Sequence, residues 1–230
     1  MGGQACVFYG AAEFSRDSDF AILAESENLD RLRTALKELQ AEVIAVPPFE
    51  ISYLLRGHAV HFRSKHPDCI GLRVDVMAVM RGVDPFEELW ERRTSLELPE
   101  GAICHLLSIP DLVQAKKTQR DKDWPMIRRL LEADYFEHRD NEPDAGRIRF
   151  WLRELRTPDL LIAVAANFPV LAREAQDQRP LIAFALSGSS DDLENALHAE
   201  ELEERRRDRN YWLPLKKELE SLRHQSSGKI

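Results

Sequence analysis

The spacing of hydrophobic residues changes near residue 109 of this 230-residue chain. Before that point, short runs alternate between apolar and polar positions, as expected of β-strands, and leucines at helical spacing lie between some of them. The expected strands span residues 20–24, 42–46, 59–63, 72–80 and 102–107, and the expected helices span 4–9, 29–39 and 51–55. This part of the chain is therefore predicted to be an α+β domain with a small mixed sheet flanked by helices.

After residue 109 the pattern is helical. The expected helices span residues 112–119, with Asp111 as the N-cap, and then 123–136, 145–155, 158–166, 169–176, 181–186 and 191–222. Pro214 should kink or break the last of these, because proline lacks a backbone N–H and crowds the preceding turn. A polar stretch at 138–144 separates the two parts. We therefore predict a first domain at 1–134 and an all-helical domain at 135–230.

Composition indicates an ordinary globular protein, with 43% hydrophobic and 31% charged residues. The chain has neither an apolar run long enough to cross a membrane nor a signal-peptide pattern. Three widely spaced cysteines favour reduced thiols in a cytoplasm over a disulfide frame or a zinc site. The net charge of −8 argues against a broad nucleic-acid-binding surface. Residues 112–131 are locally basic, so this segment is either a solvated helix face or a contact for triphosphate or RNA.

Two adjacent glycines, Gly2 and Gly3, precede the first expected helix. Because glycine has no Cβ, it lets backbone amides at a helix N-terminus approach a polyphosphate closely. Downstream, Asp17 and Asp19 open a strand, and their spacing of two places both carboxylates on one face. Paired carboxylates beside bound phosphates suit Mg²⁺, a hard cation that prefers oxygen ligands. This order of motifs predicts a metal-dependent enzyme that acts on a nucleoside triphosphate.

Asp75 is a third candidate ligand. In the expected strand 72–80, Val74 and Val76 lie on one face, and Arg73 and Asp75 lie on the other. A carboxylate inside an apolar strand needs a cation partner, because otherwise it would cost several kcal/mol or stay protonated. The partner is either a metal ion shared with the two upstream aspartates or the guanidinium of Arg73 or of another arginine.

Each of these motifs also has a structural interpretation. An Asp-x-Asp pair arises often by chance among 40 Asp and Glu residues, and a glycine pair near an end of the chain can belong to a floppy terminus. The histidines His58, His61 and His66 do not predict a zinc site. His58 and His61 are three positions apart on an expected strand, so their side chains should face opposite sides.

The run GGQACVFYGAAEFSRDSDFAIL resembles the start of the polymerase-beta-like nucleotidyltransferase superfamily. It is similar to the Gly-Gly-x-Ala variety, which includes the abortive-infection (type IV toxin) nucleotidyltransferases. That motif is a glycine pair, a short helix ending in glycine, a Ser or Thr, and then Asp-x-Asp, which correspond here to Gly2, Gly3, Gly10, Ser15, Asp17 and Asp19. The strand with Asp75 matches the family's third-aspartate strand, and the segments with Lys116 and Arg120 resemble its following helix pair. The resemblance covers roughly residues 1–134.

The resemblance implies transfer of a nucleoside monophosphate from a nucleoside triphosphate to a hydroxyl of an RNA end, a protein or a small molecule. It implies two magnesium ions, or manganese, as cofactors. The residues that it assigns are Asp17, Asp19 and Asp75 to metal binding and catalysis, and Gly2, Gly3, Ser15, Lys116 and Arg120 to nucleotide binding. A cytoplasmic toxin–antitoxin context is implied as well, with an antitoxin-like partner protein and no membrane. The alternative is a non-catalytic nucleotide-binding or protein-interaction module of the same fold.

The sequence departs from the family pattern in two places. Members usually carry an arginine a few residues before Asp-x-Asp, whereas Arg16 lies directly beside Asp17 here. The family's glycine pair also follows a strand, so we expect the first strand of the sheet to be missing or replaced by another segment. The glycine pair should then be poorly anchored, and the strand that contains Phe20 should lie at an unpaired sheet edge.

Overall fold

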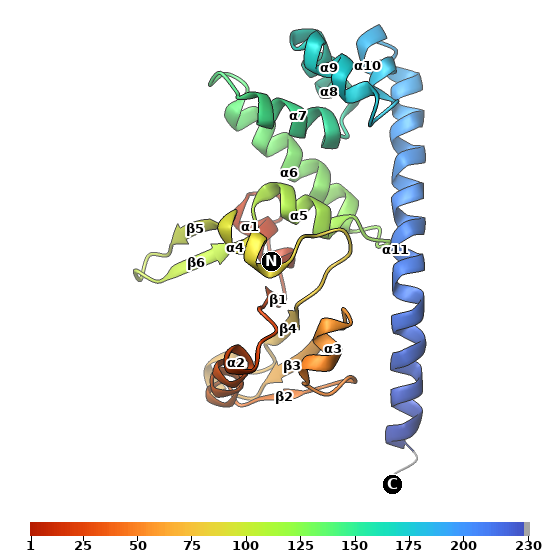
Figure 1. Ribbon diagram of the computed structural model, residues 1–230. Helices are drawn as coiled ribbons and strands as arrows, with labels where there is room; N and C mark the ends of the chain where they lie inside the picture. Colours follow the sequence, from red (N-terminus) through yellow and green to blue (C-terminus); the bar gives the residue numbers. More distant parts are fainter. Residues whose placement is uncertain (228–230) are drawn as a thin grey trace. The chain divides into compact units, whose positions relative to one another are not determined.

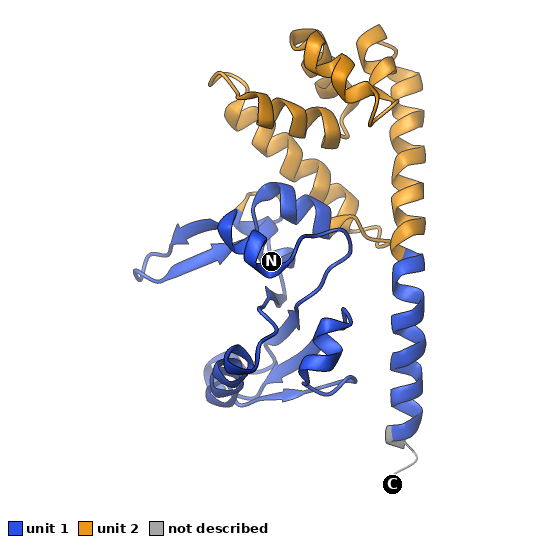
Figure 2. Ribbon diagram, in the orientation of Figure 1, with its two compact units in different colours: residues 1–8, 12–115, 209–230 blue, residues 9–11, 116–208 orange. Residues whose placement is uncertain are grey.

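The computed structural model describes residues 1–227 and has a mixed α+β fold, as predicted. The chain packs into two compact units, coloured separately in Figure 2. The first, called here the sheet unit, contains Met1–Phe8, Ala12–Ala115 and the described residues from Arg209 onward. The second, the helical unit, contains Tyr9–Ala11 and Lys116–Asp208. These boundaries differ from the expected division at residue 134, because that position lies inside a continuous helix, Asp123–His138.

The main sheet of the sheet unit has four strands: β1 (Asp17–Ala21), β2 (Ala41–Val43), β3 (Val60–Ser64) and β4 (Arg73–Met77). Their order across the sheet is β1-β4-β3-β2 (Figure 1). The β1–β4 pair is parallel, while β3 is antiparallel to both β4 and β2. Among the described residues β1 pairs only with β4, so β1 lies at a sheet edge, as expected.

One face of this sheet carries the hydrophobic core. Helices α2 (Ser26–Glu38) and α3 (Ile51–Leu55) contribute buried leucines to it. On β4 the apolar residues alternate with polar ones, so the valines turn to the core and the polar side chains turn to the opposite face. The buried cluster consists of Leu29, Leu36, Leu54, Val60, Phe62, Val74 and Val76.

The rest of the sheet unit consists of short elements. They are α1 (Gly2–Phe8), the 3₁₀ turn η1 (Pro67–Cys69), α4 (Phe86–Glu91), the hairpin β5 (Thr94–Glu97) with β6 (Ile103–Leu106), and α5 (Ile109–Lys116). Helix α5 starts earlier than predicted because Ser108, not Asp111, caps it. The backbone N–H of Asp111 donates to Ser108 Oγ at 3.3 Å, which satisfies one of the exposed amides of the first turn.

The helical unit contains α6 (Asp123–His138), α7 (Ala145–Glu154), α8 (Pro158–Asn167), α9 (Pro169–Gln176) and α10 (Ile182–Ser187). The first part of α11 (Ser190–Ser227) completes it. Trp151 is fully buried, and its indole N–H donates to Asp134 Oδ2 at 2.7 Å. Asp134 also binds Arg147, so this buried carboxylate is paired as its burial requires.

Helix α11 continues through Pro214, contrary to the predicted break (Figure 1). A proline removes one intrahelical hydrogen bond, and contacts of the following turns offset this loss. Leu215 is buried, and Glu218 accepts from His58 Nε2 at 2.7 Å and binds Arg56 at 2.8 Å, both within the sheet unit. The hydrogen bond from His58 and the charge of Arg56 lower the pKa of Glu218. None of the described helices combines the length and apolar character needed to span a membrane.

Candidate functional site

The register of β1 and β4 brings the predicted aspartates to one face of the sheet. Asp19 lies opposite Asp75, and Asp17 lies opposite Arg73. In parallel strands in register, opposed residues project to the same side, so these four side chains lie on the face opposite the apolar core. The backbone thus places Asp19 opposite Asp75 and puts Asp17 on the same face, whereas the expected approach of all three carboxylates to metal-binding distance stays a prediction.

Asp75 is nearly buried and has two partners on this face. Arg73 Nε donates to Asp75 Oδ1 at 2.9 Å, and His61 Nδ1 lies 2.9 Å from the same oxygen. His61 is the β3 residue opposite Asp75, so Asp19, Asp75 and His61 form a row across three strands. Burial alone would raise the pKa of Asp75, but the hydrogen bonds with His61 and Arg73 outweigh it, and this pKa is lowered. Asp75 is consequently ionised at neutral pH.

The positive charge of Arg73 is stabilised by the carboxylates on this face of the sheet. Its hydrogen bond to Asp75 raises the pKa of the guanidinium, and the charges of Asp17 and Asp19 raise it further. The guanidinium therefore lies in the combined field of all three carboxylates. Arg73 is thus the cation partner that the sequence offered as the alternative to a metal ion.

The glycine pair packs directly against Asp19. The backbone N–H of Gly3 donates to Asp19 Oδ2 at 3.3 Å, and Met1 N donates to the Asp19 carbonyl at 2.7 Å. A Cβ built on Gly2 would lie 1.9 Å from Asp19 Oδ2, and Gly2 has a φ of +67° that other residues rarely adopt. The expectation that the glycine pair is poorly anchored is wrong, because these contacts fix it to the edge strand.

Ser15 also belongs to this cluster. Its Oγ donates to the carbonyl of Asp17 at 2.9 Å, and a Cβ on Gly3 would lie 2.5 Å from the same Oγ. Glycines at positions 2 and 3 therefore let α1 approach both Ser15 and Asp19. The structure brings together Gly2, Gly3, Ser15, Asp17, Asp19 and Asp75.

Lys116 and Arg120 lie in the helical unit and surround a buried carboxylate. Lys116 Nζ is 3.1 Å from Asp123 Oδ1, and Arg120 Nε is 2.7 Å from Asp123 Oδ2. Burial raises the pKa of Asp123, but the charges of Lys116 and Arg120 and a hydrogen bond from Thr118 lower it overall. These two cations therefore have a structural partner, and their predicted contact with a nucleotide stays a prediction.

A metal ion would need at least three suitable side chains at close range. Within residues 1–227, no group of three or more His, Cys, Asp or Glu side chains lies close enough together to hold one. The donor set nevertheless fits a hard cation in kind, because carboxylate oxygens on two neighbouring strands share one face. Arg73 already acts there as a stand-in cation. That Asp17, Asp19 and Asp75 hold Mg²⁺ therefore stays a prediction.

Sequence reasoning missed His61 as a member of this site. The available signal was the alternation along β3, where Val60 and Phe62 are buried and His61 between them must face the other side. That face carries Asp75 on the neighbouring strand. Placing His61 beside Asp75 requires knowing that β3 pairs with β4, and the spacing of the histidines in the sequence does not show this pairing.

No protein-family model matches this chain, and no curated protein sequence matches it. The resemblance to nucleotidyltransferases therefore rests on the motif residues of the sequence and stays a prediction.

Proposed function

We propose that the sheet unit is a nucleotidyltransferase that moves a nucleoside monophosphate from a nucleoside triphosphate to a hydroxyl acceptor. The observation that carries this proposal is the register of β1 and β4, which sets Asp19 opposite Asp75 on the face that also carries Asp17. The packing of the glycine pair against Asp19 supports this proposal, because it brings the glycine pair and the Asp-x-Asp pair of the motif together.

Each residue of the cluster has a role in this proposal. Asp17 and Asp19 hold the cation from β1, and Asp75 holds it from β4. Asp75 stays ionised because His61 and Arg73 lower its pKa, so its carboxylate also accepts the hydrogen bond of the attacking hydroxyl. Bound magnesium would offset the charge of the triphosphate and polarise its α-phosphate. The acceptor oxygen then bonds to the α-phosphorus, its proton passes to Asp75, and the bond to the leaving pyrophosphate breaks.

Arg73 takes the place of the arginine that the sequence lacks before Asp-x-Asp. Its side chain is 36% exposed, so the guanidinium has room to turn from Asp75 toward a phosphate. Turned away from Asp75 Oδ1, the guanidinium of Arg73 would contact the triphosphate, for which its planar donors are well suited, and would leave the Asp75 carboxylate to hold a cation.

The acceptor in this proposal is an RNA end, a protein hydroxyl or a small molecule. A cytoplasmic location and an antitoxin-like partner protein are further parts of the proposal. The location rests on the three widely spaced cysteines, and the partner protein rests on the resemblance alone. A second candidate function is a nucleotide-binding or protein-interaction module without catalysis. The ion pair between Arg73 and Asp75 favours this second candidate, because it already satisfies a carboxylate that catalysis requires.

An assay of label transfer tests the proposed function. The protein is incubated with each α-labelled nucleoside triphosphate, Mg²⁺ and cell extract, and the label is then sought in RNA, protein and small molecules. The proposal predicts labelled product with the wild type and none with Asp19→Asn. Asp68→Asn is the matched control, because Asp68 is a 91% exposed carboxylate on η1. Equal labelling by the Asp19 variant, or none with any nucleotide, would reject the enzyme and leave the non-catalytic module.

A further inference from the structure

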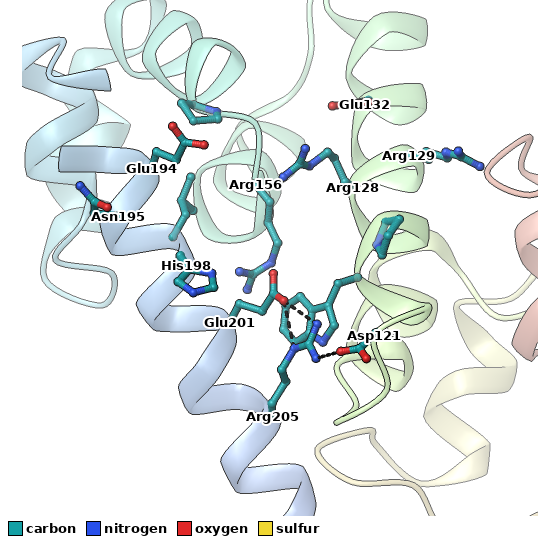
Figure 3. A pocket seen from close by; sticks show the side chains of 14 residues that line it. Asp121, Arg128, Arg129, Glu132, Arg156, Glu194, Asn195, His198, Glu201 and Arg205 are labelled. Carbon is teal, nitrogen blue, oxygen red and sulfur yellow. Dashed lines mark hydrogen bonds and ion pairs between the residues drawn. The ribbon is translucent and has the colours of Figure 1, made fainter. Parts of the chain in front are cut away.

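The helical unit contains a pocket of about 770 Å³, separate from the aspartate cluster of the sheet unit (Figure 3). Its walls come from α6, from the segment that joins α7 to α8, and from the first part of α11. The volume is in the range of sites that enclose a small organic molecule. Nothing in the proposed function uses this pocket.

Arg156 is a buried cation in the wall of the pocket. Its side chain is 7% exposed, and its guanidinium carbon lies 4.6 Å from the centre of the Trp124 ring. Nη2 binds Glu200 Oε2 at 3.2 Å, but Nε and Nη1 are buried without a hydrogen-bond partner in the part of the chain that the structure describes. Buried donors without acceptors are costly, so a ligand that supplies oxygen acceptors here would be stabilised.

Arg179 makes the surroundings of Arg156 more positive. Arg179 binds the same carboxylate, Glu200, at 2.8 Å, and it also donates to the carbonyls of Leu152 and Leu155. Two guanidiniums therefore share one carboxylate. Burial lowers the pKa of Arg156, Glu200 opposes this effect, and Arg179 adds to it. The charges of Glu154 and Glu201 also act on Arg156, so what Arg156 lacks is hydrogen-bond acceptors at Nε and Nη1.

Arg128 supplies a second positive charge. It is exposed on α6, extends toward the pocket in Figure 3, and has no ion-pair partner among residues 1–227. Arg205, by contrast, is held by Glu201 and Asp121. Arg156 and Arg128 therefore offer two guanidiniums with free N–H donors to a phosphate monoester, whose charge is about −1.5 to −2 at pH 7.

The remainder of the lining suits the organic part of such a ligand. Pro125, Pro158 and Leu197 provide rigid apolar surface. Glu194 and Asn195 on α11 provide polar oxygens that accept hydrogen bonds from hydroxyl groups. A ligand with a phosphate at one end and hydroxyl groups at the other would therefore find complementary groups for both.

We propose that this pocket binds a small organic phosphate of the sugar-phosphate class. Its phosphate lies against Arg156 and Arg128, and its hydroxyl groups face Glu194 and Asn195. This site is independent of the proposed transfer reaction, because none of the residues that line it has a role in that reaction. It requires no metal ion.

Calorimetric titration of the whole protein in EDTA tests the proposal. The probes are ribose 5-phosphate, inorganic phosphate and ribose. Ribose 5-phosphate is expected to bind at least tenfold more tightly than inorganic phosphate, and ribose is expected not to bind. Because EDTA removes divalent cations, metal-dependent binding at the aspartate cluster cannot produce this result. Equal binding of ribose and ribose 5-phosphate, or no binding of either, would overturn the proposal.

Variants then locate the site. Arg128→Ala should weaken ribose 5-phosphate binding at least tenfold, whereas Arg207→Ala should leave it unchanged, because Arg207 pairs with Glu203 and Glu204 outside the pocket. Arg156→Met should abolish binding, with circular dichroism as the check of folding. If that variant does not fold, the Arg128 comparison still decides. Binding that Arg128→Ala leaves unaltered would reject the assignment to this pocket.

Discussion

Asp19 and Asp75 occupy opposite positions on the parallel strands β1 and β4, although they are far apart in the sequence. Like charges at such positions repel each other, and this repulsion destabilises the strand pair. Arg73 and His61 offset the repulsion by binding Asp75 Oδ1. The edge strand β1 is therefore held against β4 by backbone pairing and by a cation that lies among three carboxylates.

Replacing Asp75 with Asn should destabilise the metal-free protein. The substitution leaves Arg73 without the anion that it binds at 2.9 Å and weakens the contact with His61. We expect a loss of about 1–3 kcal/mol in the free energy of unfolding, measured by urea denaturation in EDTA. Asp17→Asn is the comparison, since it removes a carboxylate of the same face and should cost less. A variant at position 75 as stable as the wild type would contradict the ion pair.

Gly2→Ala should disturb the site more than Gly10→Ala. Both glycines have positive φ angles, so alanine costs about 1–2 kcal/mol of backbone strain at either position. Only at position 2 would the new Cβ collide with Asp19, at 2.6 Å from its Cβ, whereas nothing lies within 4 Å at position 10. Thermal melting should show the larger loss for Gly2→Ala. Equal losses would mean that the contact between Gly2 and Asp19 contributes nothing.

Lys116→Met should destabilise the helical unit through Asp123. The carboxylate of Asp123 is fully buried, and removing one partner of a buried pair typically costs about 3–5 kcal/mol. The double variant Lys116→Met, Asp123→Asn should lose much less than the sum of the two single losses, because neither charge is then stranded. Urea denaturation of all four proteins measures the coupling. Additive losses would show that Lys116 and Asp123 do not stabilise each other.

The same pair predicts a loss of stability in acid. The pKa of Asp123 is lowered from its usual value of 3.8, because Lys116 and Arg120 outweigh the effect of burial. The folded state therefore releases this proton more readily than the unfolded state. The resulting stability is complete above about pH 3.8 and is lost as the pH falls through the folded pKa. The stability difference between the wild type and Asp123→Asn, measured from pH 6 to pH 3, should shrink only below about pH 4.

Much of the fold could be predicted from local pattern. The alternation from Arg73 to Met77 identifies β4 and its buried face, and helix α9 has the predicted bounds. Strand β5 was not predicted, because Thr94–Glu97 contains a single apolar residue and becomes a strand only through pairing with β6. The continuity of α11 across Pro214 likewise depends on contacts made by Leu215 and Glu218.

The site was predictable where it depends on strand geometry. The spacing of Asp17 and Asp19, and the alternation around Asp75, each assign a carboxylate to one face. The partners of those carboxylates depend on which strands are neighbours, and this explains why His61 was missed. The role of Lys116 could not be predicted in this way. From the sequence alone, a lysine that binds a nucleotide looks the same as a lysine that pairs with a buried carboxylate, and only the structure shows that Asp123 lies beside it.

Direct measurement of metal binding tests the central claim, that the three aspartates form a cation site for a nucleoside triphosphate. Manganese, a paramagnetic substitute for magnesium, is titrated by electron spin resonance in the presence of a non-hydrolysable triphosphate analogue. Wild type and Asp68→Asn should bind manganese with the same affinity, and Asp19→Asn and Asp75→Asn should bind it at least tenfold more weakly. If all four proteins bind manganese equally, or if none binds it, the carboxylates of β1 and β4 do not form that site.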